Sequence, residues 1–120
     1  MGEGQLPTAG VAMTGPEGQE IHEAAVGDGP VDAALKAMAR ATATEFELVG
    51  MRVRSVSEGE DAQGEAALTA RIDGVPLSGR AVDTDIVAAC AQAFLDILNR
   101  AHRRQHAPAS NLPPRVSAAI

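Results

Sequence analysis

The feature of this chain that most restricts its fold is an internal repeat. A shift of 56 residues (74 − 18 = 56) places Gly18 on Gly74. The same shift matches apolar and small residues at several later positions. The other matched pairs are Ile21 and Leu77, Ala25 and Ala81, Val26 and Val82, and Ala33 and Ala89. Because one copy of such a unit cannot bury its own apolar face, the repeat predicts two similar units packed together.

The apolar spacing changes from strand-like to helix-like once in each half. In the first half Val11 and Met13 alternate with small residues, and residues 20–26 can form a second strand. Apolar positions between Val31 and Ala41 then follow helical spacing, after a proline suited to the first helical position. The first half therefore predicts two strands and a helix.

The second half follows the same plan with one more strand. Val49, Met51 and Val53 predict a half-exposed strand, and residues 58–64 predict a loop rich in glycine and acids. A further strand with apolar alternation over residues 66–72 leads into Asp73-Gly74, which is a strong two-residue hairpin signal. A short strand over residues 76–82 and a longer apolar stripe over residues 86–101 complete this half.

These patterns predict an α+β domain of two pseudo-repeated strand-strand-(strand)-helix units, with antiparallel strands and helices packed on one side. We place the domain at residues 6–104 and its units at about residues 9–42 and 46–103. Residues 1–5 are expected to form a loose N-terminus. Residues 105–120 are expected to be a disordered tail, because they combine prolines with small residues and show no periodicity.

Composition limits the possible partners. The formal net charge of −6 argues against nucleic acid, which requires clustered basic residues, and the short basic run at residues 100–104 suits a helix C-terminus. With no Trp or Tyr, and only Phe46 and Phe94, the core is thin. A thin core in a short chain favours burial of a further surface against a partner.

Cysteine content and hydropathy indicate the compartment. The single cysteine, Cys90, excludes an internal disulfide framework and fits a reducing cytosol. No apolar run approaches the roughly 20 residues of a membrane span, and no signal peptide opens the chain. We expect a cytoplasmic protein without a membrane partner.

The turn before the first helix, Gly27-Asp28-Gly29-Pro30, is the segment best suited to bind a ligand. Glycines allow close approach to the backbone, and N–H groups at a helix start attract a carboxylate or a phosphate. Alternatively, the side chain of Asp28 caps the helix and fills this place from within. The equivalent turn, Asp83-Thr84-Asp85, can satisfy its own helix amides, although its carboxylates could also meet a ligand ammonium.

Three segments resemble the C-terminal regulatory domain of 2-isopropylmalate synthases and citramalate synthases. They are GDGPVDA at residues 27–33, SVSEGEDAQGE at residues 55–65 and GRAVDTDI at residues 79–86. The resemblance covers residues 6–103 and extends to Ala93-Phe94-Leu95 and Leu98-Asn99. It implies two strand-strand-strand-helix units, a homodimer, and an end-product amino acid, leucine or isoleucine, bound at or near the dimer interface.

The resemblance also implies a set of ligand-binding residues. Those carried over from the first turn are Gly27, Asp28, Gly29, Pro30 and Ala33, and those from the second are Asp83, Thr84 and Asp85. The sequence departs from the family pattern at four places. Met51 and Phe94 replace a frequent Tyr, Cys90 replaces a frequent Ser, and Ala81 replaces a frequent Gly.

We therefore expect a non-catalytic regulatory and dimerisation domain that binds leucine or a similar small amino acid or carboxylate. It is either an excised piece of a synthase or a free-standing product that serves a separate catalytic barrel. The family's barrel and metal-binding histidines have no counterpart in this sequence. His22, His102 and His106 lack metal-ligand spacing with carboxylates, so neither a metal nor a cofactor is expected.

Two alternatives remain open from sequence. One is an enzyme or binding protein of specialised metabolism that reuses the pocket, with His22, Asp28, Asp83 and Asp85 as candidate catalytic residues. The other is a pure dimerisation scaffold whose first turn is closed by Asp28. Cys90 lies on the apolar stripe of the second helix, where a core residue is expected rather than a nucleophile.

Overall fold

The chain builds one plan twice, a β-hairpin followed by a helix. The structure is a computed structural model that describes residues 7–15, 17–58, 61–106 and 117–119. Its elements are β1 (Thr8–Thr14), β2 (Glu20–Val26), α1 (Pro30–Ala41), β3 (Glu47–Glu58), β4 (Asp61–Ile72), β5 (Val75–Asp83), α2 (Ile86–His106) and β6 (Ser117–Ala119). The shift of 56 residues carries the first residue of α1 onto the first residue of α2 (30 + 56 = 86), and the predicted α+β fold is confirmed.

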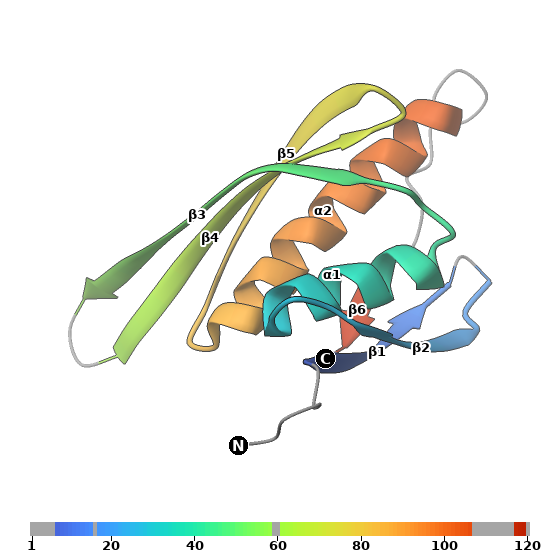
Figure 1. The fold of residues 1–120 in the computed structure, drawn as a ribbon. Coiled ribbons are helices and arrows are strands. Elements are labelled where there is room, and N and C mark those ends of the chain that lie inside the picture. The colour runs from blue at the N-terminus through green and yellow to red at the C-terminus, as the bar shows by residue number, and fades with distance from the viewer. Residues whose placement is uncertain (1–6, 16, 59–60, 107–116, 120) are drawn as a thin grey trace.

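The strands form two antiparallel three-stranded sheets. The first sheet has the order β2-β1-β6 and the second has the order β3-β4-β5. Helix α1 packs on β1 and β2, α2 packs on β4 and β5, and the two helices contact each other. The helix pair consequently lies between the sheets, as Figure 1 shows.

The two hairpin turns confirm the repeat at the level of backbone angles. Gly18 has φ of 83° and its matched residue Gly74 has φ of 78°, values that favour glycine. Asp73, with φ of 54°, precedes Gly74, so both central residues of this turn lie in the left-handed region. The Asp73-Gly74 hairpin prediction is therefore confirmed.

The core is built from small side chains at close backbone distances. The predicted buried face of β4 is confirmed, since Ala66, Leu68, Ala70 and Ile72 are all buried. A Cβ on Gly79 of β5 would collide with the carbonyl oxygen of Ala93 in α2, so this helix lies directly on the sheet. The only ring contact among the described residues joins Phe46 to the buried Phe94, with centroids 4.7 Å apart.

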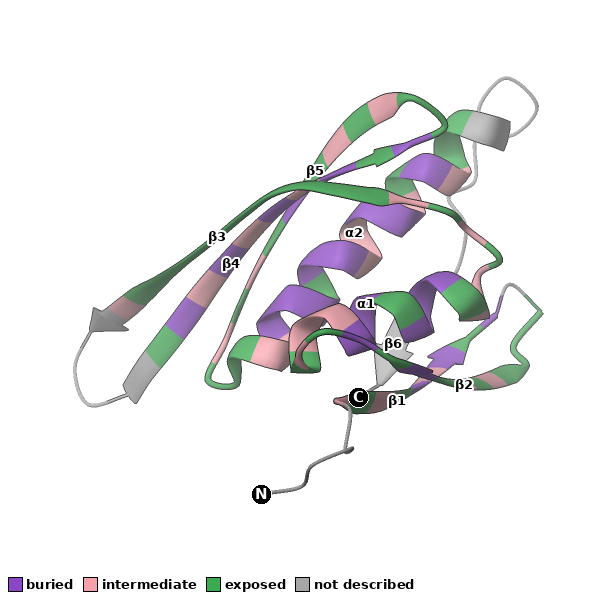
Figure 2. Ribbon diagram, viewed as in Figure 1, coloured by how far each residue is buried: buried purple, intermediate pink, exposed green. Residues whose placement is uncertain are grey.

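β3 differs from its prediction. The sequence pattern predicts a half-exposed strand, but every side chain from Glu47 to Ser55 is exposed (Figure 2). The cause is the position of α2, which covers β4 and β5 and leaves β3 as an uncovered edge. Met51 and Val53 stand beside the buried Leu68 and Ala66 of β4, on the face of the sheet toward the helices.

Two segments predicted to be irregular contain regular structure. The loop predicted at residues 58–64 is mostly strand, because β3 and β4 remain paired up to Glu58 and Asp61. The disordered tail predicted at residues 105–120 is wrong at both ends: α2 continues to His106, and residues 117–119 pair with β1. The predicted loose residues 1–5 and residues 107–116 lie outside the described part of the chain.

Candidate functional site

The first glycine turn is held in place by close backbone contacts. Gly27 is buried and donates its N–H to the carbonyl of Pro7 at 3.0 Å. A Cβ on Gly27 would lie 2.5 Å from the nitrogen of Ala33 and 2.5 Å from a carboxylate oxygen of Asp32. Glycine is therefore required here because the start of α1 folds back against the turn.

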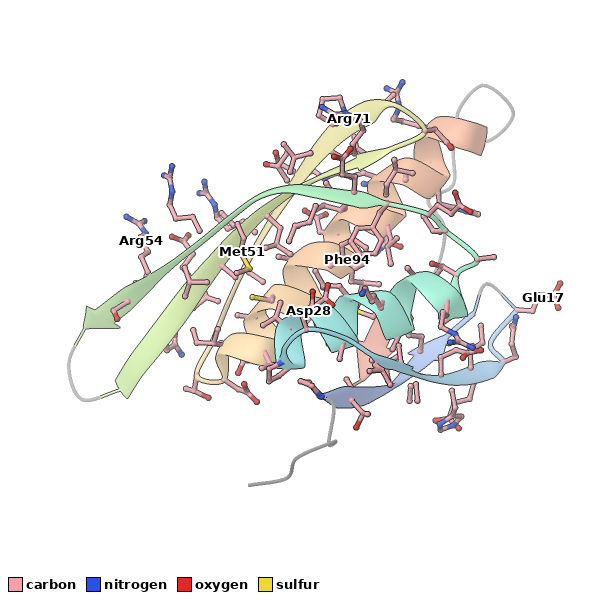
Figure 3. The ribbon with its side chains drawn as sticks, in the orientation of Figure 1. Glu17, Asp28, Met51, Arg54, Arg71 and Phe94 are labelled. Atoms are coloured by element: carbon pink, nitrogen blue, oxygen red, sulfur yellow. The ribbon has the colours of Figure 1, made fainter. Side chains whose placement is uncertain are left out.

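Asp32, and not Asp28, is the acid that closes this turn. Its Oδ2 accepts the N–H of Asp28 at 2.8 Å and lies 3.0 Å from the Lys36 ammonium. The backbone hydrogen bond from Asp28, followed by the one from Lys36, lowers the pKa of Asp32 below its ordinary value. The side chain of Asp28 is exposed and forms no cap, so the alternative in which Asp28 closes the turn is wrong. Figure 3 shows Asp28 at the start of α1.

The start of α1 retains unused donors. Gly29 is the N-cap residue and provides no side-chain hydrogen bond, while its carbonyl accepts the N–H of Ala33 at 2.9 Å. Among the described residues, the N–H groups of Val31 and Asp32 have no acceptor. The backbone of Gly29 is extended, with φ of −163°, and a Cβ added to this residue would meet no atom within 4 Å. The turn thus presents free donors beside open space.

The second turn is closed by its own side chains. Oδ1 of Asp83 accepts the N–H of Asp85 at 2.9 Å, and Oδ1 of Asp85 accepts the N–H of Val87 at 2.9 Å. The other carboxylate oxygen of Asp83 accepts a hydrogen bond from Gln92 at 3.1 Å, and Thr84 donates to Asp83. These hydrogen bonds, the one from Asp85 first, lower the pKa of Asp83. The expected capping of the second helix by the acids of this turn is therefore present in the structure.

The candidate catalytic residues are distributed over separate places. His22 lies on β2 and pairs with Glu20 at 3.3 Å, and no described contact joins His22 to Asp28, Asp83 or Asp85. Cys90 is fully buried, and burial raises the pKa of its thiol, as fits a core residue. Among the described residues, no group of three His, Cys, Asp or Glu side chains is placed to hold a metal ion. Likewise, none of the described helices is long and apolar enough to span a membrane.

Sequence reasoning missed a large groove at the opposite end of α1. It has a volume of about 1010 Å³ and runs between β2, the second half of α1 and the segment leading into β3. Its walls combine apolar Val26 and Phe46 with the cations Lys36 and Arg40. Each cation already has a partner, Asp32 at 3.0 Å for Lys36 and Glu23 at 3.6 Å for Arg40. No local motif marks this groove, because it forms only when β2, α1 and the segment after α1 pack against one another.

Comparison with known proteins identifies the family. The family described as the LeuA allosteric (dimerisation) domain matches residues 1–102. The chain belongs to this family. It is similar to the 2-isopropylmalate synthases of Gloeobacter violaceus (50% identical over 101 residues, covering 84% of this chain and 19% of the relative) and Microcystis aeruginosa (46% over 101 residues, 84% and 19%). The chain therefore spans about a fifth of the length of these relatives, and corresponds to their regulatory domain.

The four residues that are expected from the sequence to depart from the family pattern occupy different environments. Cys90 and Phe94 are fully buried in α2, where no ligand can reach them without repacking. Ala81 on β5 is partly buried against the core. Met51 is 51% exposed and lies on the side of β3 that faces the helices, whereas Arg54 lies on the other face (Figure 3). Of the four, Met51 is the residue that a partner or a ligand can contact directly.

Proposed function

We propose that this LeuA domain is a non-catalytic sensor that binds leucine or a similar small amino acid or carboxylate as a homodimer. The observation that carries the proposal is the pair of N–H groups on Val31 and Asp32, which have no acceptor among the described residues. They lie at the positive end of the α1 dipole, where a carboxylate is stabilised. A cytoplasmic location is supported by the free, buried Cys90.

The ligand-contacting residues we propose are those of the two turns. The first turn supplies Asp28, Gly29 and Pro30, with the buried Gly27 and Ala33 shaping the backbone behind them, and the second supplies Asp83, Thr84 and Asp85. Their roles differ, because the amides of the first turn suit a carboxylate and the carboxylates of the second suit an ammonium. An amino acid carries both groups, and both turns stand at helix starts on the same side of the helix pair (Figure 1).

The uncovered side of β3 supports the homodimer. Leu48, Val49, Met51 and Val53 are between 39% and 51% exposed on a single edge strand. Such an apolar edge is typical of a surface that pairs with another chain. The family's own description as a dimerisation domain favours a second copy as that chain. A separate catalytic barrel remains a further proposed partner.

The ligand proposal is tested by thermal unfolding with L-leucine, L-isoleucine and 2-oxoisovalerate. At about 100 times its dissociation constant a ligand adds roughly 2.7 kcal/mol, which raises the melting temperature by about 10 °C or more. Gly29→Val should abolish this rise, because a branched side chain would occupy the space in front of the free amides. The variant should remain folded, since the extended backbone at Gly29 accepts any residue.

The outcomes separate the possible sites. Loss of the rise in a folded Gly29→Val protein supports the first turn, and Gly29→Ala should give an intermediate rise. A full rise in Gly29→Val places the ligand elsewhere, with the groove beside Lys36 and Arg40 as the next location to examine. No rise with any of the three compounds rejects them as ligands.

The dimer proposal is tested by light scattering at micromolar concentration. The expected mass is twice that of the 12.3 kDa chain. Met51→Asp places a charge on the uncovered apolar side of β3 and should yield a monomer. Ser78→Asp is the matched control, because Ser78 is exposed on the opposite face of the same sheet. A monomeric unmodified protein, or a Met51→Asp variant that remains dimeric, would contradict the proposed interface.

A further inference from the structure

The two sheets are equivalent except for the origin of one strand. β1 and β2 of the first sheet correspond to β4 and β5 of the second by the shift of 56 residues. In the second sheet, β3 pairs antiparallel with the remaining edge of β4. In the first sheet, the same edge of β1 pairs antiparallel with β6, which comes from the far end of the chain.

No described residue of the first half can supply this third strand. Under the repeat shift, Glu58 at the end of β3 corresponds to residue 2 (58 − 56 = 2), which lies outside the described residues. Among the described residues, only β6 pairs with this edge of β1. An open strand edge presents unpaired N–H and C=O groups and readily accepts another strand.

We propose that the outer edge of β1 is a strand-binding site, which the chain fills with its own residues 117–119. Recognition is through the main chain: Ala12 faces Ala119, Met13 faces Ala118 and Thr14 faces Ser117. Main-chain pairing of this kind places little demand on the sequence of the added strand. β6 contacts α2 as well as β1, so its position depends on both halves of the domain.

Within the described part of the chain, β6 covers only part of this edge. β3 pairs along nearly the whole of β4, whereas β6 reaches only residues 12–14 of β1. Residues 8–11 of the same edge lie beyond the register of β6. A short strand of this kind protects the edge from uncontrolled pairing and can still be exchanged for a longer one.

The test measures amide hydrogen exchange by NMR in the full chain carrying Ala118→Pro and Ala119→Pro. Neighbouring residues of a strand direct their N–H groups to opposite sides, so one of the two prolines removes a donor that faces β1 whatever the register. Those amides of Ala12, Met13 and Thr14 that face away from β2 should exchange about tenfold faster or more. The melting temperature should fall by roughly 4–8 °C.

A matched variant controls for the added prolines. Ala109→Pro with Ser110→Pro introduces the same residues into the C-terminal segment outside β6 and should leave the exchange of residues 12–14 unchanged. Equal exchange in the β6 variant and the unmodified chain would overturn the proposal. Acceleration that is the same along all of β1 would also overturn it, because it would indicate general destabilisation.

A truncated chain distinguishes a strand-binding site from a fixed part of the fold. A chain that ends at His106 should regain protection at residues 12–14 when a synthetic peptide of residues 112–120 is added, and a peptide with both prolines should have no effect. If the first peptide restores nothing, the edge does not bind a strand in trans and the proposal fails. In the full chain, protection that falls on dilution would show that a second copy donates the strand, which would overturn the assignment to the same chain.

Discussion

The two strand-to-helix turns occupy equivalent positions and have opposite character. In the second turn Asp85 caps α2 and Asp83 holds the turn, so the helix amides are satisfied internally. In the first turn the N-cap is Gly29, which has no side chain, and Asp32 reaches back only as far as the amide of Asp28. Duplicating a fold therefore does not duplicate a site, because two or three side chains decide whether a helix start is available to a ligand.

The largest expected effect concerns the glycine that only the first turn requires. Gly27→Ala places a Cβ against backbone and carboxylate atoms of α1 that cannot move independently, and should cost about 2 kcal/mol, or roughly 10 °C in melting temperature. Gly29→Ala meets no atom within 4 Å and should change stability by less than about 0.5 kcal/mol. Chemical unfolding of both variants measures the difference. Equal stabilities would mean that the turn adapts freely, which contradicts a preformed site.

A smaller effect is expected from replacing one acid of each turn with alanine. Asp85→Ala removes the cap of α2 and should cost about 1 kcal/mol. Asp28→Ala removes an exposed side chain that caps nothing and should leave the free energy of unfolding nearly unchanged. Denaturant unfolding at neutral pH compares the two. A similar loss in Asp28→Ala would show that the side chain of Asp28 stabilises the start of α1 after all.

The smallest effect is a dependence of stability on acid pH. Hydrogen bonding lowers the pKa of Asp32 and of Asp83 in the folded chain below the ordinary value of 3.8. The folded state then binds protons less tightly than the unfolded state, so these contributions are present above that value and are lost as the pH falls through it. Between about pH 5 and about pH 3, Asp32→Asn and Asp83→Asn should each lose less stability than the unmodified chain. If the free energy of unfolding of either variant depends on pH as it does in the unmodified chain, the hydrogen bonds of that aspartate do not contribute to the pH dependence.

Much of the fold could be predicted because it depends on local signals. The helix beginning at Pro30 and the hairpin at Asp73-Gly74 follow from backbone preferences that act over a few residues. The alternation of Ala66, Leu68, Ala70 and Ile72 identified a buried face without any knowledge of what covers it. The 56-residue repeat then fixed how these elements group.

The remaining features depend on how separate elements pack against one another. The exposure of β3 follows from where α2 ends its coverage, and the groove at Arg40 and Phe46 requires β2 and α1 beside the segment leading into β3. The pairing of residues 117–119 with β1 spans almost the whole chain. Within the candidate site, Asp28 and Asp32 are both acids near a helix start, and only the path of the backbone shows that Asp32 is the one that reaches the turn.

The contact between Phe46 and Phe94 has a practical consequence for experiments. These are the only phenylalanines in the sequence, which has neither Trp nor Tyr. Phe94 is buried in the core, while Phe46 lines the groove beside β2 and α1, so one ring of the pair is in the interior and the other borders an open surface. Near-ultraviolet circular dichroism of the unlabelled protein therefore reports on this one ring pair, and the molecule carries its own optical probe of whether the groove is filled.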